Sequence, residues 1–390
     1  MTLSAIPVHI SIACCLSNWA IAQIDKRRRV FLWAGAESVA AGRCKVAWPT
    51  VCRPTDLRGL GILDLRFFGF ALRLRWEWLR RSDPGRGWAD LPNRRSKPVA
   101  AMSAISTSLI IGDGASALLW TDHWAPVGPL CTFAPDPFAA ISRVGKRRSV
   151  KDGLAMNRWA RDIKGALTVQ VICQFLRVWH KLQGVVLQPL QADRFVWKWS
   201  SDGKYSASSA YRAFFNGSTA LLGAREIWQA KVPPKVKFFF WLVLHRRLWT
   251  TERRKRHGLQ DNDDCALCGQ ACESIEHLFL GCVFTRELWF KLLAPAGLQA
   301  LIPLSEERIG AWWMQQRCRL HYQSRPVFDC LLLLLCWCVW KERNIRTFDN
   351  KLSSVAVVAR AAAVEADEWV QAGFSCISAL ASSWSYFLSS

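Results

Sequence analysis

The sequence predicts an α+β fold that is predominantly helical, with a small domain that contains an aromatic β-hairpin and is flanked by helical segments. Apolar residues recur at helical spacing over much of the chain, including 141–183 and the residues after Ala294. Aromatic residues instead surround an Asp-Gly pair at Asp202 and Gly203, which is typical of a hairpin turn. The 390 residues are 51% hydrophobic, so the chain can bury sizeable cores instead of remaining disordered.

The length predicts two or three domains, at roughly 150 residues per domain. A helical region is expected over 1–90, and a linker rich in Gly, Pro and Arg over 81–98. A connector with a short hairpin and helices is expected over 100–190. The small domain covers 195–294, and a helical extension covers 295–390.

Two strand pairs are expected. In the connector, 109–111 and 117–120 flank a tight turn at 112–114, which predicts strand, turn and strand. In the small domain, the aromatic segment from Phe195 is expected to pair across the Asp-Gly turn with the segment at Tyr205.

The chain is strongly basic, with 52 Lys and Arg against 30 Asp and Glu and a formal net charge of +22. Such an excess favours polyanionic partners, RNA or DNA foremost, although a basic protein without a physiological anion is the alternative. The longest apolar run, Cys330–Trp340, is shorter than the roughly 20 residues that cross a bilayer. We therefore expect no membrane partner.

The cysteines predict a reducing, intracellular location, in the nucleus or the cytoplasm. There are 15 of them, they are scattered, and the N-terminal residues lack the order of a secretory signal. A disulfide framework is therefore not expected.

Four residues have the spacing of a metal site. Cys265 and Cys268 are separated by two residues, and His277 and Cys282 follow within the next fourteen. Three thiolates and one imidazole suit Zn²⁺, and four protein ligands leave no open position, so one structural zinc per chain is expected. The alternative is a core histidine among small buried cysteines. Cys272 is close enough to compete with His277, but its spacing crowds the ring closure, and we interpret it as a bystander.

A basic segment precedes the metal ligands: 225–260 carries ten basic residues and two acidic ones. It predicts either a phosphate-contacting patch or a solvated charged face. Trp228, Trp241 and Trp249 either stack on unpaired bases or belong to the core, and the core is the favoured interpretation. The residues expected to contact nucleic acid are Lys231, Lys235, Lys237, Arg246, Arg247, Arg253, Arg254, Lys255 and Arg256.

An aromatic strand, a Lys-Val-Pro-Pro-Lys block and the Cys-Cys-His-Cys set occur in this order between Trp197 and Trp289. This order resembles the zinc-binding domain that follows the polymerase in plant non-LTR (LINE-type) retrotransposon reverse transcriptases. Weaker similarity extends to 24–33, 48–64, 71–78, 112–124 and 340–348. The residues that match in the main segment are Trp197, Asp202, Gly203, Tyr205, Ser206, Ser209, Ala210, Tyr211, Trp228, Lys231 to Val236, Phe239, Trp241, His245, Leu248, Thr250, Cys265, Cys268, Glu273, His277, Leu278, Cys282 and Trp289.

The chain departs from this family in two respects. Arg58 stands where the family usually has a glycine. A reverse transcriptase also needs paired aspartates in an aromatic context to hold two metal ions, and the one Asp-Asp pair, Asp263 and Asp264, lacks that context. No endonuclease-like set precedes it either, so we expect no enzymatic activity.

The sequence therefore favours a non-catalytic, retroelement-derived zinc-binding protein that binds RNA or DNA through a basic face. A polymerase-containing retroelement protein is a possible partner. The alternative is a structural or protein-interaction scaffold with a structural zinc. A hydrolase built on His123 or His180 is a third hypothesis, weakly supported because neither has an evident nucleophile partner.

Overall fold

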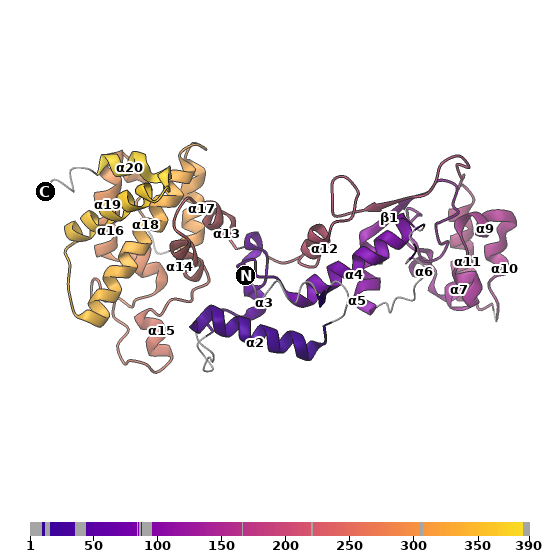
Figure 1. Cartoon of the computed structure of the whole chain (residues 1–390), viewed down its shortest axis with the longest axis horizontal. Helices are drawn as coiled ribbons and strands as arrows, with labels where there is room; N and C mark the ends of the chain where they lie inside the picture. Colours follow the sequence, from indigo (N-terminus) through magenta and orange to yellow (C-terminus); the bar gives the residue numbers. More distant parts are fainter. Residues whose placement is uncertain are drawn as a thin grey trace. The chain divides into compact units, whose positions relative to one another are not determined.

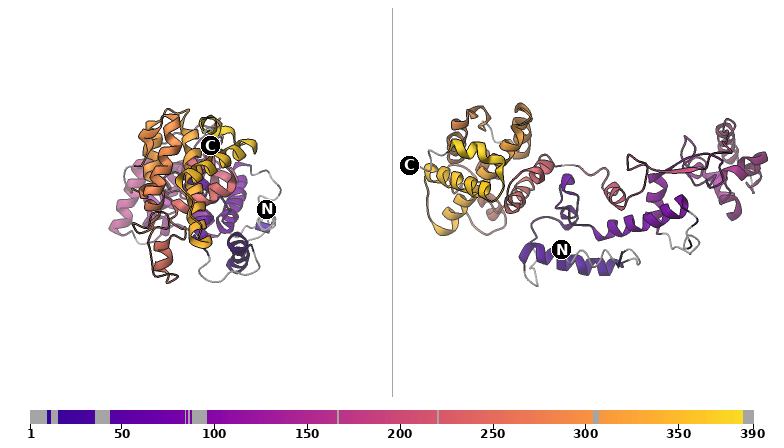
Figure 2. Two further views of the ribbon diagram at one scale, coloured as in Figure 1. Left: turned by 90° about the vertical axis from the view of Figure 1, so that its left-hand side faces the viewer. Right: turned by 45° about the horizontal axis from the view of Figure 1, so that its top comes forward.

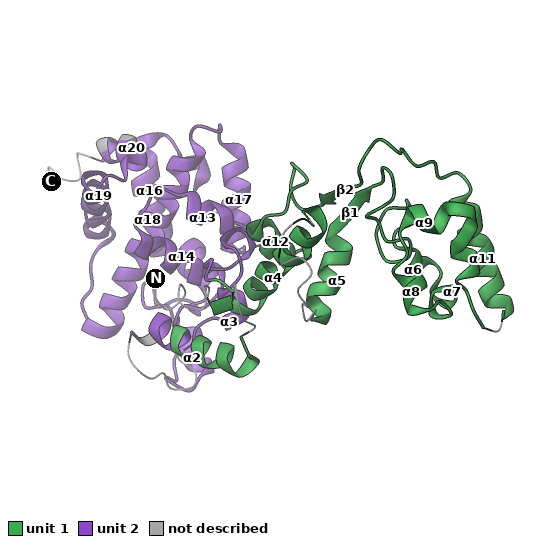
Figure 3. Ribbon diagram, turned by 45° about the vertical axis from the view of Figure 1, so that its right-hand side comes forward, with its two compact units in different colours: residues 1–28, 63–216 green, residues 29–62, 217–390 purple. Residues whose placement is uncertain are grey.

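The computed structural model is mainly helical, with one two-stranded sheet among the residues that it describes (Figure 1). The predominantly helical prediction is thus confirmed. The chain forms two compact units, coloured separately in Figure 3: a first unit of residues 1–28 and 63–216, and a second unit of residues 29–62 and 217–390. The described residues are 10–11, 16–35, 44–83, 85, 87, 96–165, 167–219, 221–303 and 307–384.

Helix α2 (Asn18–Ala34) contributes to both units. The first unit further contains α4 (Leu65–Ser82), α5 (Lys97–Ser106), β1 (Thr107–Ile110), α6 (Leu130–Phe133), α7 (Pro135–Ala139), α8 (Arg143–Lys146), α9 (Val150–Leu154), η2 (Ala155–Asn157), α10 (Arg158–Arg161), α11 (Val169–Leu182), β2 (Arg194–Trp197) and α12 (Ala207–Ala213). Of the predicted linker, residues 84, 86 and 88–95 lie outside the described residues.

The second unit contains α3 (Trp48–Val51), η1 (Thr55–Leu57), α13 (Ala224–Gln229), α14 (Pro234–Leu244), α15 (Thr251–Arg256), η3 (His277–Gly281), α16 (Val283–Leu293), η4 (Ala294–Ala296), η5 (Gln299–Leu301), α17 (Ile309–Arg319), α18 (Arg325–Asn344), η6 (Ile345–Asp349), α19 (Val355–Gln371), η7 (Ser375–Ile377) and α20 (Ser378–Ser383).

The sheet corrects both predicted strand pairs. Strand β1 pairs antiparallel with β2, with Ser108 opposite Val196, whereas 117–120 and Tyr205 lie outside the strands. The predicted segments around 109 and 195 do form strands, but they pair with each other. After β2, the amide of Trp197 donates to the carbonyl of Gly203 at 2.8 Å, so the Asp-Gly turn closes a loop and not a hairpin.

A carboxylate explains why the turn at 112–114 does not form a hairpin. Asp193, just before β2, accepts backbone N–H groups from Gly112, Gly114, Ser116 and Ala117 at 2.8 to 3.0 Å. A Cβ at Gly112 would lie 2.2 Å from a backbone oxygen, so the close approach requires glycine. The loop thus wraps around Asp193 instead of extending into a second strand.

The first unit has a core in which tryptophans dominate. Trp120 and Trp159 are fully buried and meet edge to face, with ring centroids 6.3 Å apart. Helix α4 packs against α12, where the rings of Phe67 and Phe214 stack at 5.3 Å. Aromatic pairs of this kind add to the stabilisation from area burial.

The second unit has its own larger core. Pro234 starts α14, a position that tolerates proline because the first helical N–H has no intrahelical partner. Helix α19 packs against both α16 and α18, and the orange and yellow helices gather in one group in the turned views (Figure 2). Residues 331–335 of α18 are all fully buried in this core. None of the described helices combines the length and the apolarity that a membrane crossing requires.

Residues 44–62 pack with this second core, whereas the sequence predicts them as part of a helical region over 1–90. Val46 and Val51 are buried among the side chains of α14 and the later helices. The carbonyl of Arg58 accepts a hydrogen bond from Nε1 of Trp241 at 2.9 Å. The chain therefore places an early segment against the region that contains the metal ligands.

Candidate metal centre and nucleic-acid interface

The structure brings Cys265, Cys268, His277 and Cys282 together, with their ligating atoms all within 4.8 Å of one another. Sγ of Cys265 lies 3.9 Å from Sγ of Cys282, and Sγ of Cys268 lies 3.4 Å from Nε2 of His277. Bonds of about 2.0 to 2.3 Å in a tetrahedron place neighbouring ligand atoms roughly 3.5 to 3.8 Å apart. The donor set and its spacing therefore fit zinc. Cys272 is exposed and lies outside this group.

Two tight local structures position the ligands. The amide of Gly269 donates to the carbonyl of Cys265 at 2.8 Å, and its φ of 65° lets the chain turn back after the first cysteine pair. His277 begins the π-helical turn η3, and Cys282 follows as the N-cap of α16. The amide of Cys282 donates to the carbonyl of His277 at 2.7 Å, which holds the last two ligands at fixed separation.

A hydrogen bond between two of the thiols shifts their pKa values in opposite directions. The Cys265 thiol donates to Cys282, and this hydrogen bond lowers the pKa of Cys282 and raises that of Cys265. Burial raises the pKa of both thiols. A bound Zn²⁺ supplies the positive charge that favours the thiolate form of each coordinating cysteine.

A buried ion pair ties the ligand loop to α18. The Arg343 guanidinium lies 2.8 Å from Oε1 of Glu273, and the two side chains are 1% and 0% exposed. The same carboxylate accepts the amides of Thr251 at 2.8 Å and Ala266 at 3.2 Å. One carboxylate thus connects α18, the start of α15 and the Cys265 turn. Glu273 and the segment 340–348 resemble the family in sequence, but that resemblance does not predict this ion pair.

Arg346 makes a second connection between the C-terminal helices and the metal loop. Its Nη1 donates to the carbonyl of Leu267, between the first two cysteines, at 2.8 Å. Its Nε is held by Glu342 at 2.8 Å. The metal loop, residues 265–282, is therefore stabilised both by its own turns and by side chains from α18 and η6.

The comparisons with known proteins agree with this geometry. Residues 205–289 match the family described as zinc-binding in reverse transcriptase. The resemblance to that domain is thereby confirmed. The chain is also 26% identical, over 336 residues, to an Arabidopsis thaliana protein named as a ribonuclease H protein. The alignment covers 75% of this chain and 50% of the relative, so the chain spans about half of its length. No solved structure matches the chain significantly.

The nine predicted nucleic-acid contacts divide into two classes. Four are held by acids of the same unit: Lys235 by Glu365 at 3.9 Å, Arg246 by Glu276 at 2.9 Å, Lys255 by Asp263 at 3.0 Å and Arg256 by Glu252 at 2.5 Å. Within the described part of the chain, the others form no ion pair. This second class is Lys231, Lys237, Arg247, Arg253 and Arg254.

The three tryptophans near the basic residues differ in exposure. Trp241 is fully buried and Trp228 packs against the same core, as the core interpretation predicts. Trp249 is half-buried, and the Arg253 guanidinium lies over its ring at 4.4 Å. His257 meets the same ring edge to face at 5.2 Å. Trp249 is thus an aromatic side chain at the surface, among basic residues.

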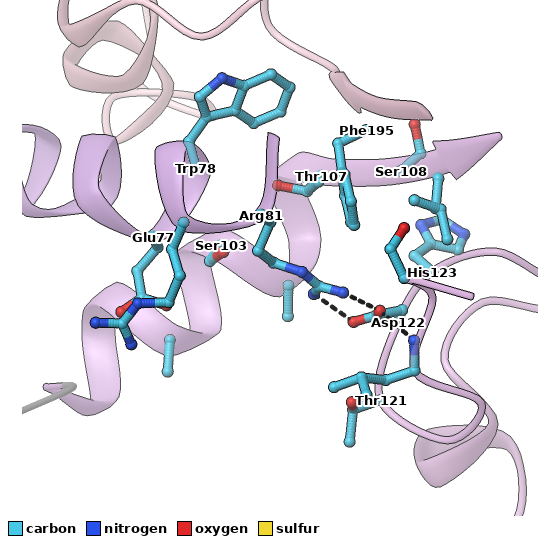
Figure 4. Close-up of a pocket in the computed structure, with 16 residues that line it drawn as sticks. Glu77, Trp78, Arg81, Ser103, Thr107, Ser108, Thr121, Asp122, His123 and Phe195 are labelled. Carbon is cyan, nitrogen blue, oxygen red and sulfur yellow. Dashed lines mark hydrogen bonds and ion pairs between the residues drawn. The ribbon is translucent and has the colours of Figure 1, made fainter. Parts of the chain in front are cut away.

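A pocket of about 460 Å³ lies in the first unit, lined by α4, α5, β1 and the 116–123 loop. Figure 4 shows Arg81 donating to both carboxylate oxygens of Asp122. Lys198 donates to Nδ1 of His123 at 2.9 Å, and burial and this lysine lower the pKa of His123. Asp122 is thus engaged by an arginine and His123 by a lysine. His180 lies exposed in the last turn of α11.

Proposed function

We propose that this chain is a non-catalytic zinc-binding protein derived from a plant LINE-type retroelement, and that its second unit binds a single strand of RNA or DNA. Cys265, Cys268, His277 and Cys282 hold the zinc. The observation that carries the proposal is that five basic side chains in the same unit as the metal centre form no ion pair with any described acid. Such side chains can neutralise phosphates without first breaking an internal ion pair.

The zinc supports binding indirectly in this proposal. Four protein ligands close its shell, so the metal orders the loop and takes no part in a reaction. Glu273 connects the ordered loop to α15, because its carboxylate accepts a hydrogen bond from the amide of Thr251 at the start of that helix. The basic residues of α15 are then presented on a fixed backbone.

The name of the Arabidopsis thaliana relative suggests a nuclease as another candidate function. A nuclease that uses two metal ions needs clustered carboxylates. Among the described residues, the cluster that has three or more metal-ligating side chains is the Cys-His centre. We therefore propose binding without cleavage.

A scaffold is the second candidate function, because four of the nine predicted contacts are occupied by internal ion pairs. In that case the remaining charges only keep the protein soluble. Partner proteins, including a polymerase-containing retroelement protein, would then bind elsewhere on the chain.

Binding to unrelated single-stranded RNAs over a salt series tests the proposal. We expect similar affinities for different sequences, because phosphate contacts carry little sequence information. Changing Arg253, Arg254, Lys255 and Arg256 together to Ala should lower the slope of log affinity against log salt by about 1.4, since two of the four are free and each contributes about 0.7. With Mg²⁺ the RNA should stay intact. Equal binding by the wild type and the variant would instead favour the scaffold.

A further inference from the structure

We propose that Phe348 and Arg254 form a stacking site for one unpaired base of a bound strand. The identity of the strand as RNA or DNA rests on the proposed function. The site itself rests on the exposure of the Phe348 ring, on its contact with Arg254, and on one carboxylate that links the two elements carrying these residues.

The Phe348 ring lies at the surface, in the π-helical turn η6. It is 63% exposed, and the Arg254 guanidinium of α15 lies over it, 5.4 Å from the ring centroid. Arg254 forms no ion pair with a described acid, so its charge is free to attract an anion. An open aromatic ring and an uncompensated cation therefore lie side by side where α15 meets η6.

Hydrogen bonds on both sides of Phe348 fix the backbone that carries its ring. Before it, Oγ1 of Thr347 donates to the carbonyl of Arg343 at 2.8 Å. Nη2 of Arg346 donates to the carbonyl of Ser353, beyond the end of η6, at 2.8 Å. A ring on a fixed backbone loses less conformational entropy on binding than a ring on a mobile loop. The ring is therefore presented in advance of any ligand.

A carboxylate of the metal loop connects the two elements that carry the pair. Glu273 accepts the amide of Thr251, the first residue of α15, at 2.8 Å. It also pairs with Arg343, just before η6, at 2.8 Å, and this ion pair is buried. The position of Arg254 relative to Phe348 is thus set by buried contacts within the second unit.

The chemistry of the pair fits a nucleotide. Every nucleobase has a π face that stacks on an aromatic side chain irrespective of sequence, and a guanidinium beside it attracts the phosphate. Unpaired bases can be splayed out onto such a ring, whereas the bases of a duplex are stacked on one another. Trp249 suits this role less well, because it is half-buried and its ring already contacts Arg253 and His257.

The charge around the ring favours a nucleotide over an apolar side chain of a protein partner. Helix α15 carries four basic residues in its last turn and one acid, Glu252, in its first. After Phe348, the exposed Asp349 and Lys351 carry opposite charges, so the excess from α15 remains. Such an excess attracts an anionic ligand and gives an apolar one no advantage.

Substitutions of Phe348 in the full chain test the stacking. Phe348→Leu keeps an apolar side chain but removes the ring. It should weaken binding of a single-stranded RNA at least about fivefold, the lower end of the cost of losing one stacked base. Phe348→Tyr keeps the ring and should retain the affinity. The matched control is Phe290→Leu on α16, because Phe290 is 54% exposed in the same unit; it should leave binding unchanged.

Two further measurements separate stacking from phosphate contacts. Phe348→Leu should leave the slope of log affinity against log salt unchanged, whereas Arg254→Ala should lower it by about 0.7. A strand with the same phosphates but without bases should bind equally to the wild type and to Phe348→Leu. Zinc content and circular dichroism establish that each variant is folded.

The outcomes distinguish this site from the proposed function. Equal affinity of the wild type and Phe348→Leu for RNA overturns the stacking site, while a lower slope for Arg254→Ala leaves the proposed function standing. A loss of affinity that Phe290→Leu shares, or that persists on the strand without bases, also overturns the site. If the wild type binds neither RNA nor DNA, the proposed function fails and the stacking site fails with it.

Discussion

Arg343 and Glu273 form a buried ion pair beside the metal loop, and each needs the other because neither reaches solvent. Arg343→Met retains much of the side-chain volume but leaves the Glu273 carboxylate buried without its cation. We expect the free energy of unfolding to fall by about 3–5 kcal/mol, measured by urea denaturation with zinc present. Adding Glu273→Gln to Arg343→Met should recover part of that loss.

An exposed ion pair provides the matched control for the Arg343→Met variant. Lys291 and Glu287 lie one turn apart on α16 and are largely solvated, at 3.8 Å. Lys291→Met should change the free energy of unfolding by less than about 1 kcal/mol. A similar small loss for Arg343→Met would show that the carboxylate is stabilised by its backbone donors alone.

The four metal ligands could be predicted from sequence because they lie within eighteen residues and their spacing is local. The buried ion pair of Glu273 with Arg343 could not be predicted. Arg343 lies 70 positions after Glu273, so only the folded chain brings the two side chains together. The ion pair of Lys255 with Asp263 was also out of reach, because it joins a helix to the loop that follows, whereas Glu252 and Arg256 are four residues apart on one helix.

The strands show the same limit at the scale of elements. Aromatic and β-branched residues predicted which segments extend, at 109–111 and from Phe195. They did not predict the partner, because consecutive strands are often but not always neighbours in a sheet. The Asp193 carboxylate prevents a local hairpin, because it accepts the amides of Gly112 and Gly114 and so fixes the turn at 112–114.

Removing that carboxylate should destabilise the sheet of the first unit. Asp193→Ala leaves several backbone N–H groups without their acceptor, and the partial exposure of the site limits the expected loss to about 1–3 kcal/mol. Burial raises the pKa of Asp193, but hydrogen bonds from Gly112, Gly114 and Ser116 outweigh it and lower the pKa below its usual value. The stabilisation is therefore present above the unfolded pKa and is lost as the pH falls through the folded pKa.

Urea denaturation at neutral and acidic pH would measure this contribution. The difference in stability between the wild type and Asp193→Ala should shrink toward acid. Asp202→Ala gives a comparison at an exposed carboxylate: the backbone hydrogen bond from Lys204 lowers the pKa of Asp202 too, so a smaller loss that also shrinks toward acid is expected. A difference that persists unchanged in acid would indicate a packing effect and not the carboxylate charge.

At the scale of the whole molecule, the two units have separate cores, and the metal centre belongs to one of them. A loop that depends on metal for its order loses that order when the metal is removed. We therefore expect about one zinc per chain by metal analysis, and chelation should lower the melting temperature of the second unit while leaving the first unit unchanged. Cys272→Ser should keep the zinc, whereas changing Cys265 and Cys268 together to Ser should abolish its binding.

Hydrogen exchange followed by mass spectrometry can resolve the two units within one chain. After chelation, exchange should accelerate first in 265–282 and then in α15, because Glu273 connects the loop to the start of that helix. The amides of α4 and α12 should keep their protection, since these helices pack together through Phe67 and Phe214 in the unit without metal ligands. Equal acceleration in both units would contradict their independence. Unchanged exchange in 265–282 would show instead that Arg343 and Arg346 order the loop without zinc.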